Sequence, residues 1–212
     1  MTNLNDLGRQ YELSHLEEHD LKPQPLEQFQ LWIQDAIEGK VKDPNAMVLS
    51  TVNAQGLVSS RLMLLKYFDK NGLVFFTNYH SPKAQALQEH PQATLLFWWS
   101  EFERQVRIDG LVEKLDSEHS DAYFQKRERE SNIAAMLSKQ STPLNDKKSF
   151  IDLFEKERNK SSDDALIRPP FWGGYLLKPV YYEFWQGGPH RLHDRLVYRK
   201  IKEDWEITRL YP

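Results

Sequence analysis

The spacing of hydrophobic residues predicts one N-terminal helix followed by a series of strands. Hydrophobic side chains recur at helical intervals from Leu26 to Ile37, and Gly39 is placed to end this helix. From Ala46 onward, hydrophobic residues follow the two-residue period of strands, with turn residues between the runs. The expected strands span residues 46–53, 57–68, 73–78, 93–100, 104–115, 174–185, 195–201 and 205–212.

Two further helical regions are expected among the strands. Ser81 and Pro82 suit an N-cap and a first helical position, and residues 117–160 are predicted to be helical with a break near 141–143. Because strands outnumber helices and follow one another as hairpins, the expected fold class is mainly β with helices (α+β), an antiparallel barrel with peripheral helices. Residues 1–24 are polar and aperiodic and are expected to form a flexible arm, with residues 25–212 as a single domain.

Composition narrows the classes of protein to consider. The 212 residues include no cysteine, which excludes disulfides, thiolate nucleophiles and cysteine-ligated metals. No basic start precedes an apolar run and no run reaches the ~18 apolar residues of a membrane span, so we expect a cytoplasmic protein without a membrane partner. A net charge of −3 argues against a nucleic-acid partner.

Familiar catalytic motifs are missing from the sequence. It contains no glycine-rich phosphate loop of the P-loop or Rossmann type and no GxSxG nucleophile motif. His190 and His193 are three residues apart, but neither a carboxylate nor a third histidine stands at metal-ligand spacing, so no metal site is expected.

Two short segments place cations where an anion could bind. Arg61 and Lys66 bracket four apolar residues, as in an edge strand with charged ends or in an anion site. On one regular strand the two would point to opposite faces, which favours two separate phosphates. Residues 77–83 form the start of a helix and end in Lys83; they could cradle a phosphate or simply be a capped helix with a solvated lysine.

A third basic segment follows Trp185. Gly187, Gly188 and Pro189 predict a tight turn, after which Arg191, His193 and Arg195 alternate and would share one face of an extended chain. Neighbouring cations repel unless an anion lies between them. The alternatives are a solvated basic hairpin and, for Trp185, a place in the core.

These segments together resemble the pyridoxine/pyridoxamine 5′-phosphate oxidase family. The resemblance rests on FWQGGPHRLHDR (184–195), RLMLLK (61–66), ERQVRIDG (103–110), SKQS (138–141) and FWGG (171–174), in the family's order from about residue 9 to the C-terminus. It implies a split β-barrel, a homodimer with FMN at the subunit interface, and oxidation of pyridoxamine or pyridoxine 5′-phosphate by molecular oxygen.

The resemblance also implies roles for individual residues. The positions that match FMN contacts are Arg61, Leu62, Met63, Leu64, Leu65, Lys66, Phe76, Thr77, Lys83, Gln105, Gln140, Ser141, Trp185 and Arg195. Those that match the substrate-phosphate group are Lys66, Tyr123, Arg127 and Ser131. Arg191 and His193 match the catalytic residues that hold the pyridine ring over the flavin, and Arg9 and Tyr11 fall in a segment that can close over the substrate.

Two departures from the family pattern stand out. Pro82-Lys83 replaces a frequent Arg-Lys pair on the FMN phosphate loop, and Gly8, Glu17 and Glu18 make the N-terminal segment less basic than in some members. Two rivals remain open: a non-catalytic flavin or pyridoxal phosphate carrier, and a flavin reductase or other split-barrel oxidoreductase. The first does not require Arg191 with His193, and the second does not require Tyr123, Arg127 and Ser131.

Overall fold

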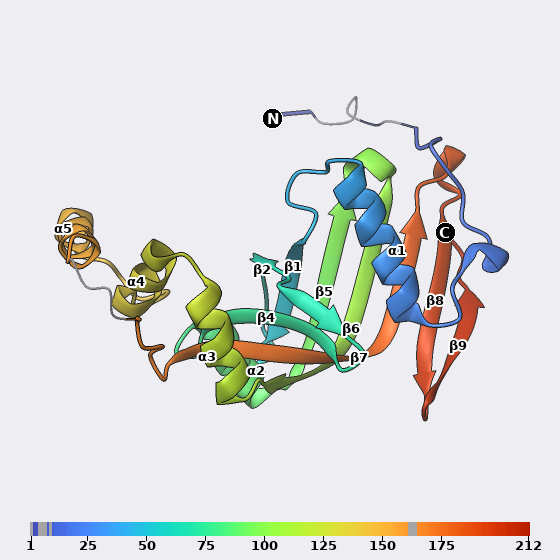
Figure 1. Cartoon of the computed structure of the whole chain (residues 1–212). Helices are drawn as coiled ribbons and strands as arrows, with labels where there is room; N and C mark the ends of the chain where they lie inside the picture. Colours follow the sequence, from blue (N-terminus) through green and yellow to red (C-terminus); the bar gives the residue numbers. More distant parts are fainter. Residues whose placement is uncertain (1, 4–7, 9, 161–164) are drawn as a thin grey trace.

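The computed structural model describes residues 2, 3, 8, 10–160 and 165–212, and its centre is an antiparallel sheet (Figure 1). The strands are β1 (Ala46–Val52), β2 (Val58–Leu64), β3 (Tyr67–Asp69), β4 (Gly72–Asn78), β5 (Gln92–Trp99), β6 (Arg104–Lys114), β7 (Trp172–Gln186), β8 (Asp194–Ile201) and β9 (Asp204–Arg209). The α-helices are α1 (Pro25–Glu38), α2 (Pro82–Glu89), α3 (Ser117–Lys126), α4 (Arg129–Leu137) and α5 (Lys147–Arg158). The expected mainly β fold with peripheral helices is confirmed.

The sheet curls so that the two end strands of its main path, β2 and β3, are consecutive in the sequence. Its order is β2-β1-β5-β6-β7-β4-β3, with β8 and β9 continuing from β7. Only Leu65 and Lys66 separate β2 from β3. The Leu65 amide donates to the Asn45 carbonyl before β1, and the Lys66 amide donates to the Val74 carbonyl in β4. The prediction of one strand over residues 57–68 is therefore wrong, because the chain crosses there between the two edges of the sheet.

Aromatic side chains fill the inside of the curled sheet, and α1 covers them. Phe29 and Trp32 of α1 are buried, with Phe29 against Phe97 (ring centroids 5.0 Å apart) and Trp32 edge-on to Phe184 (5.2 Å). The predicted end of this helix is confirmed, since Gly39 is its C-cap. Burial of large aromatic rings is the main stabilising contribution of such a core.

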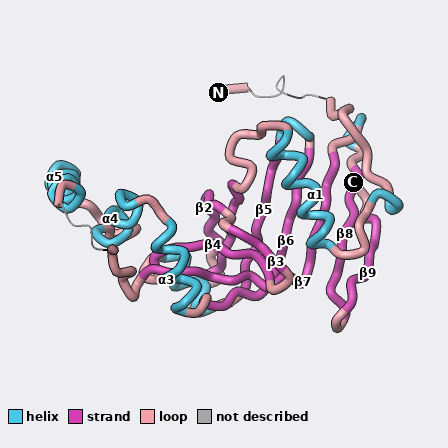
Figure 2. The backbone as a smooth tube through the Cα atoms, in the orientation of Figure 1, coloured by secondary structure: helices cyan, strands magenta, loops and turns pink. Residues whose placement is uncertain are grey.

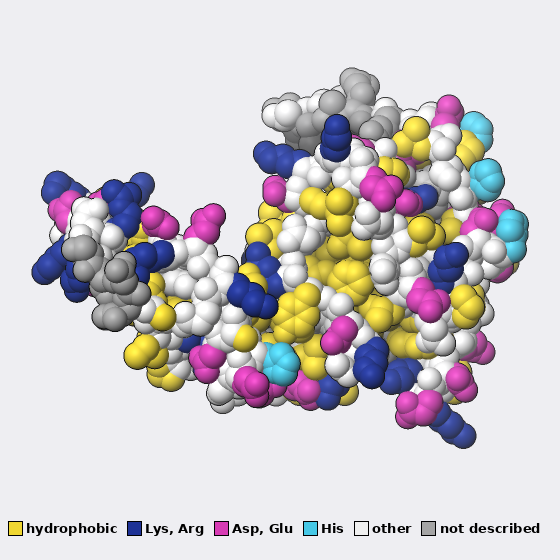
Figure 3. All heavy atoms as spheres, in the orientation of Figure 1, with side chains coloured by type: hydrophobic (Ala, Val, Ile, Leu, Met, Phe, Trp, Pro, Cys, Tyr) yellow, Lys and Arg dark blue, Asp and Glu magenta, His cyan; other side chains and the backbone are white. Residues whose placement is uncertain are grey.

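Helices α3, α4 and α5 form an arm at one end of the sheet (Figures 1 and 2). The predicted helical region divides twice, at residues 127–128 and over residues 138–146. Figure 3 shows the molecule hollowed between this arm and the sheet, with Lys and Arg side chains beside the hollow. None of the helices in the described part of the chain is long and apolar enough to span a membrane.

Candidate active site

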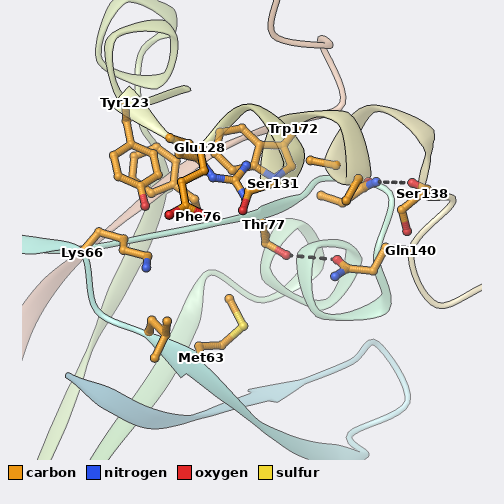
Figure 4. Close-up of a pocket in the computed structure, with 15 residues that line it drawn as sticks. Met63, Lys66, Phe76, Thr77, Tyr123, Glu128, Ser131, Ser138, Gln140 and Trp172 are labelled. Atoms are coloured by element: carbon orange, nitrogen blue, oxygen red, sulfur yellow. Dashed lines mark hydrogen bonds between the residues drawn. The ribbon is translucent and has the colours of Figure 1, made fainter. Parts of the chain in front are cut away.

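A cavity of about 680 Å³ lies where the connection between β2 and β3 meets α3 and α4 (Figure 4). This volume falls in the range of small-molecule sites. Its walls come from β2, β4, α3, α4 and the first residue of β7. The residues singled out in the sequence that line it are Met63, Leu64, Lys66, Phe76, Thr77, Tyr123, Arg127, Ser131 and Gln140.

Lys66 and Arg127 bring two positive charges to this cavity, and neither is ion-paired with Glu128, the carboxylate that also lines it. Within the described ranges neither side chain makes an ion pair or a hydrogen bond, and Arg127 Nη1 is buried without a partner. Burial lowers the pKa of Lys66, and the positive charge of Arg127 lowers it further. Burial also lowers the pKa of Arg127. A buried guanidinium nitrogen without a partner is costly, and with Lys66 nearby this part of the cavity suits an anionic group.

Three stacked rings form the wall beside Arg127. Phe76 lies 3.9 Å from Tyr123 and 5.4 Å from Trp172 between ring centroids, with interplanar angles of 19° and 16°. The Arg127 guanidinium carbon lies 4.6 Å from the centroid of the Trp172 ring. Figure 4 shows Lys66 across the cavity from these rings. Sequence patterns alone assign Trp172 no role; the only signal for it is its place in the FWGG segment.

A second cationic group lies beside the cavity, around Lys83. The Lys83 ammonium is buried and donates to Thr77 Oγ1 (3.2 Å), Ser81 Oγ (3.3 Å) and Gln140 Oε1 (3.2 Å), all neutral acceptors. Burial lowers the pKa of Lys83, and the nearby charge of Arg61 lowers it further. The solvated lysine of the simpler interpretation is therefore wrong.

Ser81 occupies the N-cap of α2 but does not cap it with its side chain. Its hydroxyl donates to the Asn78 carbonyl at 2.7 Å instead. Pro82 stands at the start of the helix, as predicted. The Ser81 oxygen is thus left to accept from Lys83, which fixes the ammonium near the helix N-terminus.

Arg61 lies on β2 and is hydrogen-bonded to the neighbouring strand β1. Its guanidinium donates to the Leu49 carbonyl (3.0 Å) and Thr51 Oγ1 (2.9 Å), and burial lowers its pKa. Because Lys66 lies beyond the end of β2, the argument that strand alternation separates it from Arg61 does not apply. Two other candidates of this segment lie outside the cavity: Leu62 is 75% exposed, and Leu65 is buried in the core. Ser141, whose φ is 68°, follows the cavity residue Gln140.

The remaining candidates gather at the other end of β7. Trp185 is paired across the sheet with Gln105 of β6 and with Arg195 of β8. Its ring lies 4.6 Å from that of His193 and 5.7 Å from that of Tyr11. Trp185 is half-buried at the surface rather than part of the core cluster.

Arg191 does not share a strand face with His193 and Arg195, contrary to the sequence prediction. It lies in a 3₁₀ turn, Pro189–Arg191, where its φ is 65°, and β8 begins only at Asp194. The three cations are also not equivalent, because Arg195 Nε donates to Glu183 Oε1 at 2.7 Å. The repulsion argued from the sequence is thus relieved in part by a carboxylate.

The surroundings of His193 favour its neutral form. The Gly188 amide donates to its Nδ1 at 3.1 Å, which leaves the proton of a neutral ring on Nε2. Burial lowers the pKa of His193, and the positive charge of Arg191 lowers it further. A Cβ on Gly188 would lie 2.4 Å from the Leu192 carbonyl oxygen, so the turn requires glycine there.

The N-terminal segment lies along this end of the sheet. Tyr11 contacts Trp185 and His193, while the Leu16 amide donates to Asp194 Oδ2 at 3.0 Å. Glu17 and Glu18, noted above as departures, are ion-paired with Arg209 of β9 at 2.8 Å each. These acidic residues thus attach the segment to the sheet. Arg9 lies outside the described residues.

The two groups of candidates belong to opposite ends of one strand. Trp172 begins β7 and Trp185 comes thirteen residues later, a contour length of about 43 Å at the usual rise of a strand. Figure 1 shows β7 running from beside α3 to beside β8. A single small ligand cannot contact both ends within one chain.

Comparisons with known proteins identify the family of this chain. Family models match residues 33–160 ("Pyridoxamine 5′-phosphate oxidase") and residues 172–212 ("Pyridoxine 5′-phosphate oxidase C-terminal dimerisation region"). Proteins named pyridoxine/pyridoxamine 5′-phosphate oxidase from Thermosynechococcus vestitus and Cupriavidus metallidurans are 46% and 47% identical, over the full length of both chains in each case.

Solved structures show the same fold. PhzG from Burkholderia lata, in complex with tetrahydrophenazine-1-carboxylic acid, has a TM-score of 0.86 at 29% identity, covering 96% of this chain and 100% of its own. An FMN-binding protein from Nostoc punctiforme has a TM-score of 0.72 at 19% identity, covering 89% and 98%, and supports the fold alone. The expected split barrel is confirmed. The chain belongs to the pyridoxine/pyridoxamine 5′-phosphate oxidase family and is an oxidoreductase.

Proposed function

We propose that this protein is an FMN-dependent oxidase that converts pyridoxamine and pyridoxine 5′-phosphate to pyridoxal 5′-phosphate, for vitamin B6 cofactor synthesis or salvage. The observation that carries the proposal is the pair of cationic groups at the cavity, Lys66 with Arg127 and Lys83 with Arg61, none of which is ion-paired to a described carboxylate. Two phosphate-bearing ligands, cofactor and substrate, account for two such groups.

The residues around Lys83 fit the phosphate of FMN. A buried ammonium with three neutral acceptors lacks only an anion, and the amide groups at the start of α2 add partial positive charge. Arg61 would be the second cation on this phosphate, in a chain where Pro82 replaces a third. Met63, Leu64, Phe76, Thr77, Gln140 and Ser141 would line the rest of the cofactor.

The substrate phosphate would be held by Lys66, Tyr123, Arg127 and Ser131. All four line one cavity, and the Arg127 guanidinium is already oriented by its stacking on Trp172. Fixing the phosphate positions the reacting carbon, which is the main contribution that such residues make to rate.

The residues at the Trp185 end of β7 would complete the site of a partner subunit. Since Trp185, Gln105, Arg191, His193 and Arg195 lie at the far end of β7, they can meet the cavity only if another copy supplies them. A homodimer in which each cavity is completed by the partner's β7–β8 end satisfies this requirement. The match of residues 172–212 to a dimerisation region supports it.

Bound FMN would supply the redox chemistry, taking a hydride from the amine or alcohol carbon and passing the electrons to oxygen. For the amine, the balance is substrate, water and O₂ to aldehyde, ammonia and H₂O₂. The protein's own part is positioning: Arg191 and a neutral His193 would hold the pyridine ring, with Tyr11 closing over it. Arg9 would belong to the same closing segment.

Two rivals are less well supported. A non-catalytic carrier would not need His193 held in one tautomer beside Arg191. An oxidase of non-phosphorylated substrates, such as the carboxylic acid bound by PhzG, would not need both Lys66 and Arg127 at one cavity. The second rival predicts that inorganic phosphate fails to compete with substrate.

The test of the proposal is a visible spectrum of the purified protein and oxygen uptake with pyridoxamine 5′-phosphate. We expect a yellow protein, oxygen consumption, and competition by inorganic phosphate. A colourless protein that gains no activity with added FMN would overturn the proposal.

The role of Arg191 has its own test. We expect Arg191→Ala to lower kcat/KM for pyridoxamine 5′-phosphate at least about thirtyfold, because a charged hydrogen bond to the substrate is lost, and to leave the FMN dissociation constant nearly unchanged. Equal losses in both measurements would contradict the assignment of Arg191 to the substrate.

A further inference from the structure

Glu183 is a buried carboxylate at the end of β7 that carries Trp185. Only 4% of it is exposed, and both of its oxygens are used. Oε1 accepts from Arg195 Nε at 2.7 Å, while Oε2 accepts from the Tyr181 hydroxyl at 3.1 Å and lies 3.3 Å from Arg107 Nη2. Neither the sequence motifs nor the family resemblance assigned Glu183 a role.

Arg195 is held at two of its three guanidinium nitrogens. Nε is bound to Glu183, and Nη1 donates to the Tyr211 carbonyl at 3.0 Å. Nη2 makes no hydrogen bond within the described part of the chain, and 30% of the side chain is exposed. A planar guanidinium fixed at Nε and Nη1 directs its remaining N–H groups one way.

The location of this pair gives it a function beyond packing. A buried ion pair is seldom more stabilising than a well-packed apolar pair, so stability alone is a weak reason for it. The hydrogen bond that Arg195 donates to Glu183 raises the pKa of Arg195, but an arginine is charged at neutral pH without such help. What Glu183 changes is therefore the direction of the guanidinium.

We propose that Glu183 is a positioning residue that orients Arg195 toward FMN. This inference rests on the proposed function, in which Arg195 contacts the cofactor. Glu183 itself is diagonal to Arg195 across the β7–β8 ladder, two residues before Trp185 on the same face of the strand. Its carboxylate thus holds the guanidinium beside the Trp185 ring, where both would meet the flavin.

The test is a double-mutant cycle read out by FMN binding to the full-length protein, freed of flavin and titrated by fluorescence quenching. We expect Glu183→Ala and Arg195→Ala each to raise the FMN dissociation constant about tenfold, the loss for one charge-assisted hydrogen bond. In the Arg195→Ala background, Glu183→Ala should then add almost nothing. Glu183→Gln, which keeps an acceptor oxygen at the same place, should lose less than Glu183→Ala and provides the cycle if the alanine variant does not fold.

Arg107→Ala is the matched control, because it removes another partner of Glu183 on the side away from Arg195. We expect it to lower the melting temperature while changing FMN affinity less than about twofold. Additive losses in the cycle, or an equal loss of FMN affinity from Arg107→Ala, would overturn the positioning role. A wild-type protein that binds FMN and oxidises pyridoxamine 5′-phosphate while the cycle is additive would overturn this inference alone.

Discussion

The two ends of β7 hold their positive charges in different ways. Beside Trp172, the cations Lys66 and Arg127 have no ion-pair or hydrogen-bond partner among the described residues. Beside Trp185, the cation Arg195 is bound to Glu183, and the Gly188 amide donates to His193 Nδ1, which favours the neutral ring. The Trp172 end offers unpaired positive charge to a ligand, whereas Arg195 and His193 at the Trp185 end are already held in place by hydrogen bonds.

This difference indicates what each end contributes to a shared site. Unpaired cations gain most when a phosphate dianion binds, so the cavity end should determine affinity for phosphorylated ligands. Arg195 and His193 already have hydrogen-bond partners and act mainly by geometry, so at the Trp185 end they should determine turnover and cofactor orientation, with the Nη2 side of Arg195 adding to FMN affinity. Substitutions at the two ends should therefore differ in which constant they change.

The largest effect is expected from Arg127→Ala. Loss of two or more charged hydrogen bonds to the substrate phosphate should raise KM for pyridoxamine 5′-phosphate about a hundredfold, whereas the FMN dissociation constant should change little. Steady-state oxygen uptake and flavin titration measure the two quantities. Arg129→Ala is the control, since Arg129 is the same residue type two positions later and does not line the cavity. A comparable rise in KM from both variants would contradict the charge-presenting role of the cavity end.

Lys83→Met should have a somewhat smaller effect: it should weaken FMN binding without lowering the stability of the flavin-free protein. Removing the buried ammonium should weaken FMN binding about tenfold or more, because a charge-assisted hydrogen bond to its phosphate is lost. The flavin-free protein should become equally or more resistant to heat, by up to about 1 kcal/mol, since an ammonium with only neutral partners is costly to bury. Lower stability of the flavin-free variant would mean that Lys83 is structural.

Local patterns in the sequence predict the helices and strands but not how the sheet curls. Helix α1 and the hairpins follow from periodicity and turn residues, which act over a few positions. The break at Leu65–Lys66 depends on which strands are neighbours, a property of the whole sheet. Only this break puts Lys66 at the cavity rather than on a strand face opposite Arg61.

The same limit applies to the candidate site. Arg191, His193 and Arg195 were identified as a basic segment, but alternation misplaced Arg191 because the turn after Gly188 continues to Leu192. Glu183 was missed because its partner lies on another strand, and strand pairing cannot be derived from spacing alone. The motif resemblance selected most of the residues; the sheet register explains why they fall into two separate groups.

The pH dependence of kcat/KM tests whether turnover needs the neutral form of His193. Because the pKa of His193 is lowered, the ring stays neutral below the usual value near 6.5, and kcat/KM should fall only as pH drops through that lower pKa. His193→Asn keeps an acceptor for the Gly188 amide but cannot titrate, so it should lose this part of the acid limb. The substrate phosphate titrates identically with both proteins and cancels in the comparison. An unchanged acid limb in the variant would show that His193 does not titrate in turnover.

The smallest effect is expected from the aromatic support of Arg127. Trp172→Leu removes the ring beneath the guanidinium and should raise KM for pyridoxamine 5′-phosphate about fivefold, the value of one partly desolvated cation–π contact. Trp172→Phe keeps an aromatic face and should recover most of the loss, with kcat unchanged in both variants. If leucine and phenylalanine raise KM equally, the ring acts only by filling space, and Arg127 needs no orientation at the cavity end. If leucine lowers kcat instead, the cavity end also controls geometry, and the division of roles along β7 would be contradicted.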